Sequence, residues 1–325
     1  MELKHHILKI LEENRGNTIN GAKLASELFV TRSAVWKAMK ALQKDGYHIT
    51  AVTNKGYCLL SQNDIISEES IRPYLKDAAV GFALEVRQQV TSTNTLAKEM
   101  AAKGAREGTV LIATEQTQGR GRMGRTFYSP QSSGIYFSII LRPKLSLEDS
   151  LLITTVTAVA VAQAIETVAG VKAGIKWVND IYVGEKKVCG ILTEASINFE
   201  SGSLEYSVVG IGINIETKDF PEDIKHIAGA LFEEKPEDSP ITSLLVAEVL
   251  NNMAKYMNNI TDPEYLEAYR TRSFLIDRDI VVLKGKDTQY AKAIGIDEKA
   301  RLVVQYEDGR TEALNSGEVS VRAKR

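Results

Sequence analysis

Apolar positions in the first 60 residues recur with helical spacing and then alternate. The spacing predicts three helices, over residues 2–13, 21–28 and 32–44. In the third helix Val35, Met39 and Leu42 recur at steps of four and three residues, so they form one inward face. Thr31 stands directly before this helix and is a suitable N-cap. The pattern predicts a helix-turn-helix.

The stretch that follows the third helix predicts a β-wing. The run 47–60 carries apolar residues on both sides of Thr53-Asn54-Lys55-Gly56, which is typical of a hairpin tip. The outer face of the third helix is polar and cationic, and comprises Arg32, Ser33, Lys37, Lys40 and Lys44. A solvated surface is the ordinary explanation of such a face, but helix length, cap and wing agree with one another and favour DNA binding. The residues expected at DNA are Thr31, Arg32, Ser33, Trp36, Lys37, Lys40 and Lys55, with Trp36 suited to either groove contact or core packing.

A polar linker over residues 61–76 leads into a mixed body of helices and strands. Strands are predicted over residues 84–90, 109–114, 134–141, 173–177, 180–183, 187–195 and 206–215. Helices are predicted over residues 94–103, 147–168, 242–259 and 263–273. From Asp279 onward short alternating segments separated by Gly and Asp turns predict a small β-barrel.

Composition and charge narrow the class of protein. The 325 residues are 44% hydrophobic and 25% charged, which is typical of a folded globular chain of two or three domains. No secretory signal or membrane span is expected, and Cys58 and Cys189 lack paired spacing, so we predict a cytoplasmic protein with reduced cysteines. Residues 1–60 hold nine Lys/Arg and five Asp/Glu, a net charge of +4 that leaves −6 for the remainder. Only the basic head is therefore expected to meet a polyanion.

The most informative motif is Gly119-Arg120-Gly121-Arg122-Met123-Gly124-Arg125. Its glycines let the backbone approach a ligand closely, while its guanidinium groups offer forked donors to phosphate or carboxylate. A disordered RNA-binding Arg/Gly segment is the alternative, but such segments usually repeat, and this one occurs once between two predicted strands. The motif therefore predicts a ligand loop for a phosphorylated intermediate.

This loop resembles the GRGRxGR signature of biotin protein ligases, and further motifs follow in that family's order. They are residues 92–94 (STN), 176–180 (KWVND, where the family has KWPND), 187–192 (KVCGIL) and 210–214 (GIGIN). The resemblance covers the whole chain and implies an α+β protein with three parts. These are a winged helix-turn-helix over residues 1–62, a class II aminoacyl-synthetase-like ligase domain over 63–274 and an SH3-like domain over 275–325. One departure is Val178, where the family usually has proline, and it removes a fixed φ but no functional group.

The resemblance implies an enzyme that makes biotinyl-5′-AMP from biotin and ATP and then biotinylates a lysine of a biotin carboxyl carrier protein. It also implies a ligand-promoted homodimer that represses biotin genes at an operator. Two alternatives stay open. One is a lipoate-type ligase, against which the arginine loop and the winged helix speak; the other is a repressor without ligase activity.

Site residues follow from the motifs. Adenylation brings two anions together, so Lys187, which enters an apolar strand, and Arg122 are the expected catalytic residues, although a strand-end lysine can be merely structural. The biotin contacts implied are Ser92, Thr93, Asn94, Gln116, Arg120, Gly121, Arg122, Lys187 and Gly190. The ATP contacts implied are Arg120, Arg122, Arg125, Lys176, Asn179 and Asn214. Asn94 could instead be a helix cap, and Asp180 could hold Mg²⁺ or simply belong to a turn.

Overall fold

The computed structural model describes residues 3–52, 55–146, 148–197, 203–260, 263–284, 287–315 and 319–323. It divides into two compact units. One comprises Met1–Val80 with Glu234–Glu248, and the other comprises Gly81–Glu233 with Val249–Arg325. The predicted domain limits after residues 62 and 274 stay predictions.

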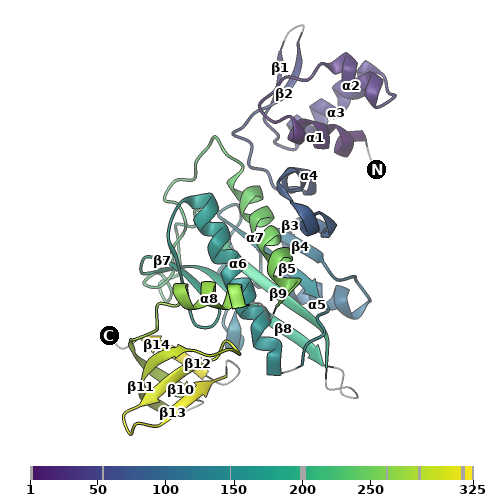
Figure 1. Ribbon diagram of the computed structural model, residues 1–325. Coiled ribbons are helices and arrows are strands. Elements are labelled where there is room, and N and C mark those ends of the chain that lie inside the picture. Colours follow the sequence, from purple (N-terminus) through teal and green to yellow (C-terminus); the bar gives the residue numbers. More distant parts are fainter. Residues whose placement is uncertain are drawn as a thin grey trace. The chain divides into compact units, whose positions relative to one another are not determined.

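The first unit contains the predicted helix-turn-helix (Figure 1). Its helices are α1 (Leu3–Glu13), α2 (Gly21–Glu27) and α3 (Arg32–Lys44). Asn20 caps α2 by accepting from the amides of Ala22 and Lys23, and Thr31 caps α3 by accepting from the amide of Ala34 at 3.2 Å. The inward face of α3 is confirmed, since Val35, Met39 and Leu42 are each 1% exposed and pack in one core with Ile7 and Leu24.

The wing is a two-stranded antiparallel sheet of β1 (Ile49–Val52) and β2 (Gly56–Leu59). Ile19 exchanges backbone hydrogen bonds with Tyr57 at 2.8 and 2.9 Å, so the α1–α2 connection lies along the outer edge of β2. Thr53 and Asn54 of the predicted hairpin tip lie outside the described residues.

The remainder of the first unit joins residues 61–80 to the segment Glu234–Glu248. It contains α4 (Glu68–Ile71), the 3₁₀ turns η1 (Arg72–Tyr74) and η2 (Asp77–Gly81, which ends in the second unit), and the beginning of α7 (Ile241–Met257). Asp64 accepts hydrogen bonds from the amide of Thr242 at 3.1 Å and from Lys235 at 2.6 Å. Ser70 bonds Ser243 at 2.8 Å. These bonds connect segments more than 160 residues apart, which is why the unit consists of two pieces of chain.

The second unit is built on a seven-stranded sheet of order β3-β4-β5-β9-β8-β7-β6. Its strands are β3 (Ala83–Val90), β4 (Thr109–Gln116), β5 (Gly134–Leu141), β6 (Ala173–Lys176), β7 (Asp180–Val183), β8 (Lys186–Ile197) and β9 (Leu204–Asn214). β3 and β4 are parallel, and the other neighbours are antiparallel. All eight residues of β5 are buried, so both faces of the sheet are covered at its centre.

Helices α5 (Thr93–Ala102) and α6 (Leu151–Ala169) cover opposite faces of this sheet. On β8, Thr193 bonds Thr154 of α6 at 2.7 Å, whereas its neighbour Glu194 bonds Lys98 of α5 at 2.8 Å. Successive side chains of a strand point to opposite faces, so the two helices lie on different sides. The predicted site motifs therefore gather on the α5 face.

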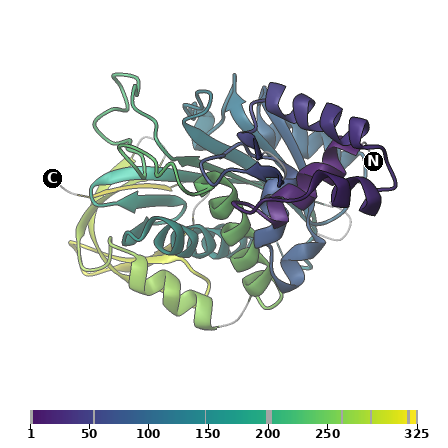
Figure 2. The ribbon, with the colours of Figure 1, turned by 90° about the horizontal axis from the view of Figure 1, so that it is seen from above.

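α6 follows the 3₁₀ turn η4 (Glu148–Ser150) and is the one helix in the described ranges that is long and apolar enough to cross a bilayer. Its most apolar window is 78% buried, as expected of a core helix. Figures 1 and 2 show it lying beside α8 (Pro263–Arg272). This contact places the longest apolar segment inside the protein.

The C-terminal strands form a separate five-stranded antiparallel sheet of order β13-β12-β11-β10-β14. They are β10 (Asp279–Lys284), β11 (Asp287–Ile296), β12 (Leu302–Tyr306), β13 (Thr311–Leu314) and β14 (Val319–Ala323). Arg270 of α8 donates to the carbonyl of Ile296 at 3.0 Å, and the Trp177 indole donates to that of Ala300 at 3.1 Å. Cys58 and Cys189 are both free and buried, as the sequence predicted.

Candidate active site and nucleic-acid interface

Three of the nine predicted biotin residues, Thr93, Asn94 and Gln116, lie on one hydrogen-bonded chain at the start of α5. Gln116 accepts from the amide of Thr93 at 2.8 Å and donates to Ser129 at 3.0 Å. Ser138 of β5 lies 2.8 Å from the Thr93 hydroxyl and donates to Asn94 Oδ1 at 2.6 Å. Ser92, Thr93 and Asn94 are 2–3% exposed. The chain therefore holds its polar groups in fixed orientations inside the protein.

Asn94 is not a helix cap. Ser92 is the N-cap of α5, without a side-chain cap bond, and Asn94 lies within the first turn. The Asn94 amide donates to the carbonyl of Leu192 at 3.1 Å and to Glu194 Oε2 at 3.0 Å. Both amide hydrogens are thus used within the protein. The side chain fastens α5 to the sheet, and only its oxygen retains acceptor capacity.

Glycines on β8 and β9 make room for the side chains that stand on this face. A Cβ atom at Gly210 would lie 2.0 Å from Asn94 Oδ1, and one at Gly212 would lie 2.5 Å from the Phe127 ring. Gly190 pairs with Gly212 across the sheet and meets the same ring. The predicted GIGIN and KVCGIL motifs thus form a floor without side chains between Asn94 and Phe127.

The arginine motif is a small hairpin that follows β4. The Gly121 amide donates to the Arg125 carbonyl at 2.7 Å, and the Phe127 amide donates to the Gly119 carbonyl at 2.9 Å. The 3₁₀ turn η3 (Arg122–Gly124) forms the tip. The loop is therefore ordered by its own backbone, and its arginines project from a defined frame.

Cationic and anionic groups meet at the edge of the glycine floor. Lys187 Nζ lies 2.6 Å from Asp180 Oδ1, and the Cβ position of Gly190 is 3.3 Å from the same nitrogen. Arg122 donates to Asn179 Oδ1 at 3.1 Å. Burial lowers the pKa of the Arg122 guanidinium, an effect that Asp180 opposes and Arg125 adds to. The arrangement concentrates positive charge in a partly desolvated place, where it attracts anions strongly.

The segment after β9 is tied back to Lys187 and Asn214. The backbone of Lys187 exchanges bonds with Ile227 and Gly229 at 2.8 and 2.9 Å. The Asn214 amide nitrogen donates to the Gly229 carbonyl at 3.0 Å, whereas its buried oxygen has no partner among the described residues. Lys176 stands opposite Asp180 in the β6–β7 pair.

The predicted Mg²⁺ residue is part of an ion pair. Asp180 is bonded to Lys187, and within the described ranges no group of three or more His, Cys, Asp or Glu side chains could hold a metal ion. One carboxylate together with substrate phosphates is nevertheless a common way to bind Mg²⁺. The residues present fit an ion that arrives with a triphosphate.

Sequence reasoning overlooked one aromatic and three polar residues at this site. They are Phe127, Ser129, Ser138 and Glu194. Ser138 and Glu194 each bond Asn94, although they lie 44 and 100 residues away from it along the chain. The sequence did contain one indication of them. Gly210 and Gly212 alternate on one face of β9, and two such glycines indicate that other side chains pack closely against that face. Arg125 is exposed, and its charge adds to the effect of burial in lowering the pKa of the Arg122 guanidinium.

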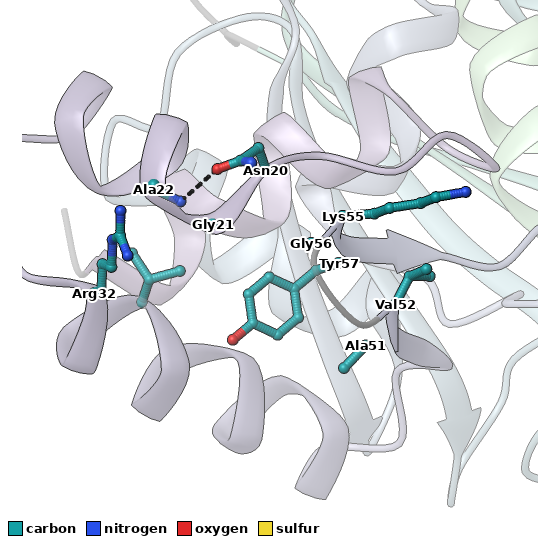
Figure 3. A pocket seen from close by; sticks show the side chains of 10 residues that line it. Asn20, Gly21, Ala22, Arg32, Ala51, Val52, Lys55, Gly56 and Tyr57 are labelled. Carbon is teal, nitrogen blue, oxygen red and sulfur yellow. Dashed lines mark hydrogen bonds between the residues drawn. The ribbon is translucent and has the colours of Figure 1, made fainter.

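The outer face of α3 is exposed as predicted. Arg32, Ser33, Lys37 and Lys40 are all exposed, and Trp36, which is 51% exposed, is not a core residue. A groove of about 450 Å³ separates the beginning of α3 from the wing. Figure 3 shows Arg32 on its helical side and Lys55 and Tyr57 on its wing side. The groove therefore has a cation on each side.

Comparison with known families assigns all three parts of the chain. Residues 86–214 match the biotin/lipoate A/B protein ligase family, residues 4–58 match a helix-turn-helix domain, and residues 275–322 match the biotin protein ligase C-terminal domain.

Whole-length relatives carry both activities in their names. The bifunctional ligase/repressor BirA of Bacillus spizizenii is 34% identical over 94% of this chain and 95% of its own length. The protein of the same name from Escherichia coli is 24% identical over 95% of this chain and 94% of its own. The solved biotin protein ligase of Aquifex aeolicus, in complex with biotin and ATP, superposes with a TM-score of 0.61 at 29% identity. That match covers 74% of this chain and 99% of the other.

Proposed function

Because the chain belongs to the biotin protein ligase family, in its bifunctional ligase/repressor form, we propose that it activates biotin with ATP, biotinylates an acceptor lysine and represses transcription. One observation carries the ligase half of the proposal. The hydrogen-bonded chain at Thr93, the arginine hairpin and the Asp180–Lys187 pair all border one glycine floor. A neutral polar head and an anionic tail would each find matching groups there.

The first step joins two anions. The biotin carboxylate attacks the α-phosphate of ATP, a carboxylate–phosphate bond forms, and pyrophosphate leaves. Lys187 and Arg122 supply positive charge where these anions meet, and the low dielectric of the partly buried site strengthens their effect. The ion pair with Asp180 orients the Lys187 ammonium. An incoming anion would compete with Asp180 for that ammonium.

Biotin would be held by the groups that border the floor. The Thr93 hydroxyl and the Gln116 amide meet the donors and acceptor of the ureido head, which must be satisfied once the ring is buried. The remaining predicted contacts are Ser92, Arg120, Gly121, Arg122, Lys187 and Gly190. Asn94 takes part through the one acceptor site that remains on its oxygen.

ATP would lie toward Asn214 and the arginine hairpin. The unpartnered oxygen of Asn214 fits the amino group of adenine, which is a donor. Arg120, Arg122 and Arg125 would contact phosphates, with Lys176 and Asn179 nearby. Mg²⁺ would arrive on the triphosphate, with Asp180 as its protein ligand, and would reduce the charge repulsion between the reactants.

In the second step the neutral amine of an acceptor lysine attacks the biotinyl carbonyl, an amide forms, and AMP leaves. We expect the acceptor to be a biotin carboxyl carrier protein or domain. The proposal predicts biotin-dependent exchange of labelled pyrophosphate into ATP. Exchange with lipoate in place of biotin would favour a lipoate-type ligase, and no exchange with either would indicate a repressor that has lost its enzyme.

The repressor half of the proposal rests on the basic head, residues 1–60. The exposed cations of α3 and the wing would contact DNA phosphates on both sides of the groove, and Ser33 and Trp36 would face the bases. Two heads on a ligand-promoted homodimer would read a palindromic operator. If the adenylate favours the dimer, linkage requires it to raise operator affinity as well.

The DNA proposal is tested by charge removal at matched positions. The full chain with Lys37→Gln and Lys40→Gln should bind a duplex, selected by the unaltered protein from a random pool, with a salt dependence lower by about two phosphate contacts. Lys9→Gln, on the exposed surface of α1, is the control and should leave the slope unchanged. Equal slopes in all three proteins would remove α3 from the interface.

A further inference from the structure

Glu194 of β8 stands between two parts of the predicted site. Its Oε2 accepts from the Asn94 amide at 3.0 Å, and its Oε1 accepts from Lys98 at 2.8 Å and lies 3.3 Å from Arg120 Nη1. Arg120 belongs to the arginine hairpin, and Asn94 belongs to the hydrogen-bonded chain of α5. One carboxylate thus connects the predicted phosphate loop to the predicted biotin pocket.

The bond to Asn94 fixes how that amide is oriented. A carboxylate can only accept hydrogen bonds, so it requires the Asn94 nitrogen to face β8 and the oxygen to face Ser138. Ser138 in turn touches Thr93, which is bonded to Gln116. Rotation of the Asn94 amide would place a donor against the Ser138 hydroxyl, so Glu194 sets the arrangement of the whole chain.

The contact with Arg120 has a different character. The Arg120 side chain is 47% exposed, and an ion pair at such a position is weak and exchanges readily. It therefore limits where the guanidinium moves without holding it irreversibly. A long side chain kept near its working position loses less freedom when an anion binds.

Burial raises the pKa of the Glu194 carboxyl. The hydrogen bonds from Lys98 and Asn94 and the charges of Lys98 and Arg120 more than offset that effect, so the pKa lies below its ordinary value. The group is ionised at neutral pH and is available for both roles.

We propose that Glu194 is a positioning residue for adenylation: one carboxylate oxygen orients Asn94 in the biotin pocket, while the other keeps Arg120 beside it for the phosphates of ATP. The inference rests on the proposed ligase function. It assigns to Glu194 two separable effects, one on biotin through Asn94 and one on ATP through Arg120.

The test compares Glu194→Gln with Glu194→Ala in the full chain, by pyrophosphate exchange and by calorimetry of biotin binding without ATP. Glutamine keeps an acceptor for Asn94 but loses the charge, so the KM for ATP should rise about three- to tenfold while the biotin dissociation constant changes less than threefold. Glu194→Ala should raise both the KM for ATP and the biotin dissociation constant. Lys98→Met is the matched control, because it removes another partner of Glu194 and should change neither by more than twofold.

A second arm places Glu194→Gln in an Arg120→Ala background. If the ATP effect acts through Arg120, the second substitution adds nothing. An undiminished effect in that background, or an equal change in both constants in the glutamine variant, would overturn the proposal. Lack of biotin-dependent exchange in the unaltered chain would instead overturn the ligase function and this inference with it.

Discussion

Replacing Gly210 by alanine is expected to disrupt the predicted biotin pocket through Asn94. The new Cβ atom would lie 2.0 Å from Asn94 Oδ1 and 2.7 Å from its Cγ. Ordinary contacts between such atoms are about 3.5 Å or longer, so the amide has to move by more than about 1 Å. Gly210 lies within β9 and pairs with both Ser138 and Leu192, so the backbone cannot easily withdraw.

The magnitude follows from the bonds that Asn94 would lose. Its side chain bonds Ser138, Leu192 and Glu194, and Asn94 itself is 3% exposed. Overpacking of a core costs about 1–3 kcal/mol, and a buried polar group left without its partner costs about as much again. We therefore expect a loss of about 2–4 kcal/mol in the free energy of unfolding. Biotin affinity should fall at least tenfold, since about 1.4 kcal/mol corresponds to that factor.

Urea denaturation and calorimetry with biotin measure the two effects. Gly295→Ala is the matched control, because Gly295 also lies in a strand but a Cβ atom there meets nothing within 4 Å. A Gly210→Ala protein that matches the control in both stability and biotin affinity would refute the account of the glycine floor.

Three further predictions concern single groups. Lys187→Ala should lower pyrophosphate exchange at least about a hundredfold, whereas Lys186→Ala, at the exposed neighbour, should not; equal rates would remove Lys187 from catalysis. Burial raises the pKa of the Glu12 carboxyl above its ordinary value of 4.5. The contribution of this group to the free energy of unfolding is therefore fully present below that pH and is lost as pH rises through the raised pKa. In urea denaturation between pH 4.5 and 7.5, Glu12→Gln should reduce the fall of the free energy of unfolding with pH. The same fall in the variant and in the unaltered protein would contradict this prediction. Phe29→Gly should stabilise the first unit by up to about 1 kcal/mol in the same assay, because Phe29 is 95% exposed at φ 54°; a loss of stability would show that the aromatic ring contributes to the fold.

Local signals were sufficient for much of the fold. The limits predicted for α3 agree with the structure, and Thr31 caps it, because apolar spacing and a capping side chain act within a few residues. The same holds for β5, whose predicted limits of 134 and 141 agree with the structure, because its run is apolar apart from Gly134 and Ser138. The motif order 92–94, 119–125, 176–180, 187–192 and 210–214 also identified which segments would border one site.

Partners that lie far apart in the sequence could not be predicted from it. Glu194 stands just beyond the KVCGIL motif, and nothing in its local spacing indicates that it bonds Asn94 and lies close to Arg120. Asn94 was expected at the ligand, yet its amide hydrogens are used by β8. Such assignments depend on strand order and register, which bring residues about 100 positions apart into contact.

The division of the first unit into Met1–Val80 and Glu234–Glu248 limits how this protein can be taken apart or recombined. The backbone passes between the units at residues 80–81, 233–234 and 248–249, so the second unit is partly an insertion within the first. No contiguous fragment contains the first unit alone. A protease that cuts near residue 80 would leave the Lys235, Thr242 and Ser243 partners of Asp64 and Ser70 on the other fragment. The helix-turn-helix unit and the ligase unit are therefore not consecutive modules that recombination can exchange independently. A recombination event that separates them at one position divides a folded unit.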